Sequence, residues 1–163
     1  MNTVMKYKLS LSQSLMTLLA TATVLLVGPT NSAFAIPEAC NGSLGIQALG
    51  NWPGSTSMTA LDGRLYITQG QGLWRVNPCD GSSIRLGAGD WTGSTSMAAL
   101  NGWLYIIQGG VLWRANPDDA SWINLGGGWG GSTTMTALNG WLYITQGQGL
   151  WRVNPSNGSS TRI

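Results

Sequence analysis

The chain contains three copies of one short unit, and this repetition constrains its fold more than any other feature. The segment Trp52-Pro-Gly-Ser-Thr-Ser-Met58 returns 39 residues later, ending at Met97, and again 38 residues after that, ending at Met135. A second segment, Leu-Trp-Arg-(Val or Ala)-Asn-Pro, recurs at residues 73–78, 112–117 and 150–155. In proteins built from such repeats, each unit packs mainly against its two neighbours. The chain is therefore expected to be an array of similar modules.

Each unit is predicted to form four short strands joined by tight turns. In the middle copy these strands are 96–100, 103–108, 112–116 and 121–125, and Asn101-Gly102 is a hairpin signal between the first two. Trp, Tyr, Ile and Val fill the strands, whereas Gly, Asn, Asp and Pro fill the turns. No segment after residue 35 has the apolar period of a helix. The repeated part is therefore all-β.

Both faces of the predicted strands carry apolar residues. In one strand, Trp74 and Val76 point to one face and Leu73 points to the other. Small antiparallel sheets that stack around an axis cover both faces, and units of about 40 residues are typical of β-propeller blades. The predicted fold is a repeat protein of three four-stranded antiparallel β-propeller blades, a partial propeller. The repeats span about 40–78, 79–117 and 118–155, and a partial strand follows at 156–163.

Two questions about closure stay open in the sequence. A β-trefoil also has three units of about this length and closes with three, but the tight turns within each unit favour blades. Propellers have about four to eight blades, so three do not enclose a channel. Either two chains form a six-bladed homodimer, or the chain is a remnant of a longer array. Residues 43–48 resemble an additional fourth strand that precedes the first unit.

The first 35 residues have the pattern of a secretory signal peptide. Lys6 and Lys8 precede an apolar stretch at 15–27, and Ala33-Phe34-Ala35 is a small-x-small cleavage pattern. The stretch is shorter than the ~20 residues of a membrane-spanning helix. We therefore predict cleavage after Ala35, a mature domain over 36–163, and a secreted or periplasmic protein that is not anchored in a membrane. In such a compartment Cys40 and Cys79 are candidates for a disulfide bond.

Composition argues against several classes of function. Beyond residue 35, six arginines balance six acidic residues, which leaves no basic surface for nucleic acid. The chain has no His, the commonest general base and zinc ligand. No Asp recurs in all three units, and no nucleophile has a base beside it in the pattern. We therefore predict a protein that is not an enzyme and that uses no metal or cofactor.

One end of the predicted blades collects residues suited to a neutral ligand. Successive antiparallel strands alternate in direction, so the loops after the second and fourth strands share that end. Indole rings can stack on the C–H groups of a sugar, and neutral hydroxyls and amides can bind its polar groups. The alternative for the tryptophans is packing between blades. The candidate ligand-binding residues are Trp52, Trp91, Trp129, Ser94, Thr95, Gln69, Gln108 and Gln146.

The repeats also resemble a known family. The run Leu-Asn-Gly-Trp-Leu-Tyr, then Gly-x-Leu-Trp-Arg-Val-Asn-Pro, then a Gly-rich segment that ends in Trp, resembles tachylectin-type β-propeller lectins over about residues 43–163. Kelch-like blades share part of the pattern at residues 116–122. The tachylectin resemblance implies binding of N-acetylated hexosamines between neighbouring blades. The leading hypothesis is thus a secreted, multivalent, lectin-like protein that binds glycans, and the alternative is a non-catalytic scaffold for protein–protein interaction.

Overall fold

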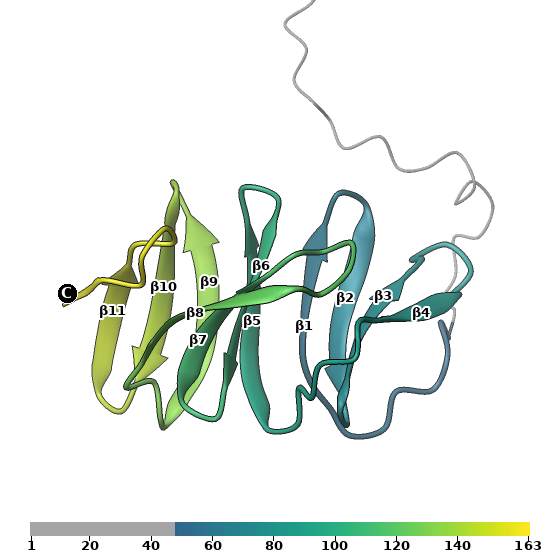
Figure 1. Ribbon diagram of the computed structural model, residues 1–163, viewed down its shortest axis with the longest axis horizontal. Helices are drawn as coiled ribbons and strands as arrows, with labels where there is room; N and C mark the ends of the chain where they lie inside the picture. The colour runs from purple at the N-terminus through teal and green to yellow at the C-terminus, as the bar shows by residue number, and fades with distance from the viewer. Residues whose placement is uncertain (1–47) are drawn as a thin grey trace, which may run out of the picture. The chain divides into compact units, whose positions relative to one another are not determined.

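The computed structural model describes residues 48–163 (Figure 1). The predicted signal peptide, Cys40 and residues 43–47 lie outside this range. Residues 48–163 form twelve strands and no helix. The strands are β1 (Ser55–Leu61), β2 (Arg64–Gln69), β3 (Gly72–Val76), β4 (Ser83–Leu86), β5 (Ser94–Leu100), β6 (Trp103–Gln108), β7 (Val111–Ala115), β8 (Trp122–Gly127), β9 (Ser132–Leu138), β10 (Trp141–Gln146), β11 (Gly149–Val153) and β12 (Ser160–Arg162).

The strands form three separate sheets, each made of four consecutive strands. We call β1–β4 the first sheet, β5–β8 the second sheet and β9–β12 the third sheet. Every neighbouring pair of strands is antiparallel, and each strand pairs with the next one along the chain. The predicted all-β fold with three four-stranded blades is confirmed. The chain does not adopt the alternative β-trefoil fold, because the strands of each four-stranded sheet are hydrogen-bonded only to one another.

A two-residue turn joins the first two strands of each sheet. Asp62, Asn101 and Asn139 have φ angles of 48°, 52° and 49°, and a glycine with positive φ follows each of them. Two successive residues with positive φ give the two-residue hairpin turn whose twist matches the flanking strands. The Asn-Gly and Asp-Gly pairs in the sequence therefore fix the register of the first two strands in every sheet.

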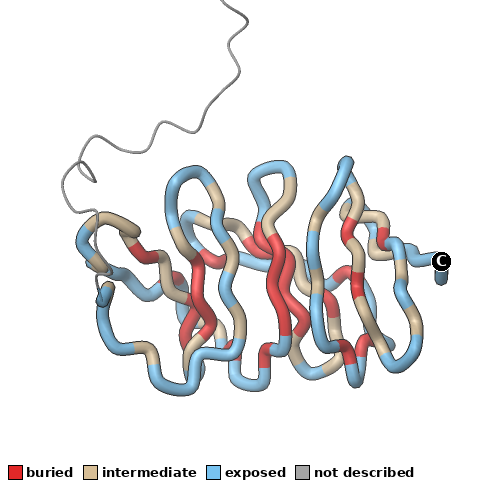
Figure 2. The backbone as a smooth tube through the Cα atoms, turned by 180° about the vertical axis from the view of Figure 1, so that it is seen from behind, coloured by how far each residue is buried: buried red, intermediate tan, exposed pale blue. Residues whose placement is uncertain are grey.

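The three sheets stack with their first strands adjacent, as blades of a propeller do around its axis. Strand β1 lies beside β5, and β5 lies beside β9 (Figure 1). One apolar cluster fills the space between the first and second sheets, and another fills the space between the second and third. The buried segments in Figure 2 lie mainly where sheets face each other, and β6 of the second sheet has four consecutive buried residues.

Each sheet presents two different apolar faces to its neighbours. The forward face, which meets the following sheet, is represented in the first sheet by Leu61, Tyr66 and Leu73. The rear face, which meets the preceding sheet, is represented in the second sheet by Met97, Leu104 and Ile106. Alternation along the strands produces both faces from one run of residues. The same forward-to-rear contact then recurs between the second and third sheets.

Candidate ligand-binding site

The three predicted glutamines connect the end of each second strand to the loop that precedes the first strand. The Nε2 of Gln69 donates to the carbonyl oxygen of Pro53 at 2.9 Å. The Nε2 of Gln108 donates to the carbonyl oxygens of Asp90 and Thr92 at 2.7 and 3.0 Å. Gln146 makes the same pair of bonds to Gly128 and Gly130, at 2.6 and 2.8 Å. The glutamines therefore hold the loops, and their amide N–H groups are occupied by backbone carbonyls.

The predicted tryptophans lie in the loops that these glutamines hold. Trp91 and Trp129 are 2% and 5% exposed, each within one of the two apolar clusters between sheets. Trp52 is half-buried, and its Nε1 donates to the carbonyl oxygen of Leu49 at 3.1 Å. The indoles of Trp91 and Trp129 thus pack between blades, which was the alternative in the sequence, and this burial removes them as open platforms for a sugar ring.

The predicted Ser-Thr pair of the second sheet divides between a structural and an exposed position. Ser94 is buried, and its Oγ donates to the carbonyl oxygen of Trp91 at 2.7 Å, which closes the loop. Thr95 is exposed. A ligand can therefore reach the side chain of Thr95 but not that of Ser94. Among the predicted glutamines, Gln146 borders a hollow in the surface.

The hollow lies at the loop end of the third sheet and has a volume of about 420 Å³. It includes one predicted residue, Gln146, and an indole, Trp151, that is not among the predicted ligand-binding residues. Trp151 is half-buried, so part of its ring borders the hollow. The lining residues are Gly130, Gly131, Gln146, Gly147, Gln148, Gly149, Trp151 and Arg162.

At two positions the third sheet carries a smaller residue than the second sheet, Ser160 for Trp122 and Gly149 for Val111. In the second sheet, Trp122 packs edge-on against Trp113, with ring centroids 4.8 Å apart. Ser160 occupies the position of Trp122 in the register of the third sheet. A side chain at Gly149 would lie 2.9 Å from the Nε1 of Trp151 and 3.1 Å from the Nε of Arg162. The difference between Trp122 and Ser160 is present in the sequence, but it does not distinguish Trp151 from Trp74, because Ser83 stands at the same position in the first sheet.

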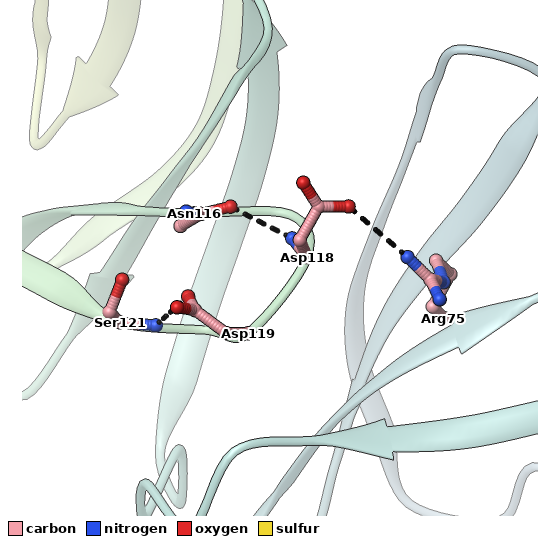
Figure 3. A network of polar contacts seen from close by, with 5 residues as sticks. All are labelled: Arg75, Asn116, Asp118, Asp119 and Ser121. Carbon is pink, nitrogen blue, oxygen red and sulfur yellow. Dashed lines mark hydrogen bonds and ion pairs between the residues drawn. The ribbon is translucent and has the colours of Figure 1, made fainter.

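A repeated arginine on the forward face behaves differently in the first sheet. Arg114 and Arg152 lie over the rings of Trp103 and Trp141, each 4.7 Å from the centroid. The first sheet has Arg64 in place of that tryptophan, and its Arg75 instead forms an ion pair of 3.4 Å with Asp118 of the second sheet (Figure 3).

Two buried tyrosines lie near these arginines. Burial raises the pKa of Tyr66 and of Tyr105, and the positive charges of Arg75 and Arg114 offset part of this rise. Both phenols therefore remain neutral around pH 7, as is suitable for groups packed between sheets.

Three carboxylates, those of Asp80, Asp90 and Asp119, accept hydrogen bonds within their own turns. The hydroxyl of Ser82 and then its backbone N–H lower the pKa of Asp80, and Thr92 lowers that of Asp90 in the same way. The backbone N–H of Ser121 donates to Asp119 at 2.8 Å and lowers the pKa of that carboxyl (Figure 3). Between residues 48 and 163 no group of three or more Cys, Asp and Glu side chains is placed to hold a metal ion.

Two further sequence predictions touch this part of the chain. Cys79 is disulfide-bonded, and Cys40, the other cysteine of the sequence, lies outside the described residues. Over residues 48–163, no helix is long and apolar enough to cross a membrane.

Solved structures share this fold at low sequence identity. A chain of a nidogen/laminin complex is 14% identical with a TM-score of 0.57, and the match covers 66% of this chain and 47% of that one. Virginiamycin B lyase from Staphylococcus aureus is 15% identical with a TM-score of 0.55, covering 67% and 40%. The extracellular domain of a putative hybrid two-component system from Bacteroides thetaiotaomicron is 16% identical with a TM-score of 0.55, covering 72% and 17%.

These similarities concern the fold alone. No protein-family model and no curated protein sequence matches the chain. The chain spans less than half of each of the three structures, so it corresponds to a part of each of them. Together with the three stacked four-stranded sheets, the similarities identify the chain as a β-propeller protein made of blade repeats.

Proposed function

We propose that the protein is a secreted, non-catalytic β-propeller lectin that binds N-acetylated sugars in the hollow of the third sheet. The observation that carries the proposal is the combination of a partly open indole, Trp151, with the side-chain oxygen of Gln146 and the amide side chain of Gln148 around one hollow. An indole face accepts the C–H side of a sugar ring, and amides and free backbone N–H groups bind hydroxyl and acetamido groups.

The charges around the hollow support binding rather than cleavage. Arg162 is the one charged residue in its lining, and its Nη2 donates to the carbonyl oxygen of Gln148 at 3.4 Å. Glycoside hydrolysis ordinarily needs two carboxyl groups that flank the bond. The residues that line the hollow include no Asp or Glu. The hollow thus supplies donors for sugar oxygens but no acid–base pair.

The choice of an N-acetylated sugar and of an extracellular location rests on the sequence and on similarity. The tachylectin resemblance of the repeats suggests the sugar class. The signal-peptide pattern at residues 1–35 and the similarity to an extracellular domain support secretion. Binding of one sugar in this hollow is expected to be weak, with a Kd near the millimolar level, or about −4 kcal/mol.

Isothermal titration of the full chain with N-acetylglucosamine and N-acetylgalactosamine tests the proposal. Ser160→Trp places an indole at the register position of Trp122, which packs against Trp113 in the second sheet. We expect this change to weaken sugar binding at least tenfold. The matched control is Ser83→Trp, the same change at the same register position of the first sheet, which should bind as the unmodified chain does. Binding by Ser160→Trp at unchanged affinity, or no binding of either sugar by the unmodified chain, would contradict the proposal.

Protein binding is a second candidate. Trp122 and Ile123 lie on β8, the outer strand of the second sheet, and both are exposed apolar side chains. A similar fold occurs in a nidogen/laminin complex. If this candidate is right, Trp122→Ala should abolish attachment to a protein-coated surface, and free N-acetylated sugars should not compete. Loss of attachment in the presence of free sugar would instead favour the lectin.

A further inference from the structure

The forward face of the third sheet has no neighbour among the described residues. Leu150 is 40% exposed, whereas its equivalent in the second sheet, Leu112, is 0% exposed. Leu138, on β9 of the same face, is 57% exposed. This face therefore presents apolar side chains that the other two sheets bury.

The residues on this face are those that form the forward face elsewhere. The three positions are occupied by Leu, Tyr and Leu in every sheet, as Leu61, Tyr66, Leu73 in the first, Leu100, Tyr105, Leu112 in the second and Leu138, Tyr143, Leu150 in the third. The third sheet thus carries a surface whose two counterparts each pack against a rear face.

The rear face of the first sheet, at the other end of the array, is exposed at Met58, whereas Ile67 on the same face is buried. Met58 is 60% exposed in the first sheet, whereas Met97 is 6% exposed in the second. The three rear-face positions are again the same in all sheets, Met, Leu and Ile, as Met58, Leu65, Ile67, then Met97, Leu104, Ile106, then Met135, Leu142, Ile144. The described residues therefore present two surfaces whose counterparts pack against each other between the sheets of this chain.

We propose that two copies of this chain pair through these surfaces. The forward face of the third sheet of each copy packs on the rear face of the first sheet of the other, and the two identical contacts close a ring of six sheets. A six-sheet ring lies within the size range of β-propellers, whereas three sheets do not close. Over the first three strands of each sheet, this contact repeats an interface already present twice in the chain.

Polar groups at this contact are already tolerated between sheets. Arg152 on the forward face of the third sheet lies over Trp141 just as Arg114 lies over Trp103 in the second sheet, whose forward face is covered. In the turn between β3 and β4, a side chain at Gly81 would meet the backbone of Leu49 of the same chain, so Leu49 already occupies the space beside this turn. The contact between copies accordingly involves the first three strands of each sheet.

Sedimentation velocity of the full chain over a range of concentrations tests this inference, and we expect a dimer. Leu138→Glu on the forward face and Met58→Lys on the rear face should each raise the dimer dissociation constant at least tenfold. Both side chains are more than half exposed, so neither change removes a buried group. Ile123→Glu is the matched control on an exposed apolar residue outside both faces, and it should leave the dimer intact.

Mixing the two charged variants separates an interface effect from a folding defect. A Leu138→Glu copy and a Met58→Lys copy can form one contact with opposite charges and one unmodified contact, so the mixture should recover a 1:1 dimer. A monomer at every concentration, dimers that survive both charge variants, or a mixture that stays monomeric would overturn the inference.

Discussion

The second and third sheets have nearly the same sequence, but they differ in what they contact. Leu112 and Leu125 of the second sheet are buried against the third, whereas Leu150 and Ile163 at the equivalent positions are exposed. Hydrophobic burial removes apolar area from water only where another surface covers it. The comparison shows that the repeat sequence encodes a surface for a neighbour, and that the position in the array decides whether the surface is used.

The same two sheets also differ at a few residues, and these decide their chemistry. Trp122 packs against Trp113 in the second sheet, whereas the third sheet has Ser160 at that position and a hollow beside Trp151. Ile107 in the second sheet replaces a threonine, Thr145, which accepts or donates hydrogen bonds with Thr133 and Thr134. Packing is therefore shared between the sheets, whereas the candidate site depends on single substitutions.

The largest expected effect tests the contrast in burial directly. Leu112→Ala should lower the free energy of unfolding by about 2–5 kcal/mol, because it leaves a cavity in a closed cluster. Leu150→Ala should cost about 0.5 kcal/mol or less in dilute solution. Urea unfolding at several protein concentrations measures both. The cost of Leu150→Ala should rise with concentration if copies associate, and equal costs in dilute solution would contradict the contrast.

A glycine of the third sheet offers the next largest effect. Gly158 has a φ of 74°, and a side chain there would overlap the carbonyl oxygen of Leu125. Gly140, with a φ of 80°, has no atom within 4 Å of that position. Gly140→Ala should therefore lower the free energy of unfolding by about 1–2 kcal/mol, the strain of a left-handed conformation at alanine. Gly158→Ala should lower it by more, because the side chain would also overlap Leu125. Thermal unfolding of both variants checks this, and equal costs would show that the contact between Gly158 and the second sheet is not tight.

A smaller effect concerns the hydroxyl that faces Ile107. Ser96 is buried, and its Oγ has no hydrogen-bond partner among the described residues. In the first sheet the counterpart is Ser57, whose Oγ forms a hydrogen bond of 2.7 Å with the Oγ1 of Thr68. Ser57→Ala should cost about 0.5–1.5 kcal/mol, whereas Ser96→Ala should be neutral or stabilising, because only Ser57 loses a bond. Chemical unfolding of the two variants measures the difference, and a larger loss for Ser96→Ala would contradict this explanation.

The smallest expected effect is a dependence on pH in one turn. Hydrogen bonds from Ser121 lower the pKa of Asp119 in the folded protein, whereas Asn157 accepts the same bond from Ser159 in the third sheet at 3.0 Å. A lowered pKa stabilises the fold above the unfolded-state value of about 3.9, and this stabilisation is lost as the pH falls through the folded value. Asp119→Asn should remove this acid-dependent part. Stability measured between pH 7 and pH 2 checks it, and an unchanged profile would contradict the assignment.

The fold could be predicted from the sequence because its signals are local and repeated three times. The Asn-Gly turns and the alternation of strand residues placed the strands within a few residues, for example Trp103 to Gln108, which is β6. The two hydrogen bonds that Gln108 donates to the backbone of Asp90 and Thr92 were not predictable in the same way. They join residues 16 or more positions apart and depend on the conformation of the loop.

The candidate site could be predicted only as one end of the blades. A polar residue or a tryptophan in a repeat has the same sequence signal whether it is buried or open, as Trp91 and Trp151 illustrate. Trp151 lies opposite Arg162, which also borders the hollow, whereas Trp113 lies opposite Asn124 and packs against Trp122. That relation appears only when the register between strands is known.

The most direct test of the proposed site is a titration of the full, isotope-labelled chain with N-acetylglucosamine, followed by the amide chemical shifts in NMR. The proposed site predicts that Gly131, Gly147 and Gly149 of the third sheet shift, while Gly93 and Gly109, at equivalent positions of the second sheet, do not. Equal shifts in both sheets, or no shift in the third sheet at saturating sugar, would contradict a lectin site in the hollow beside Trp151.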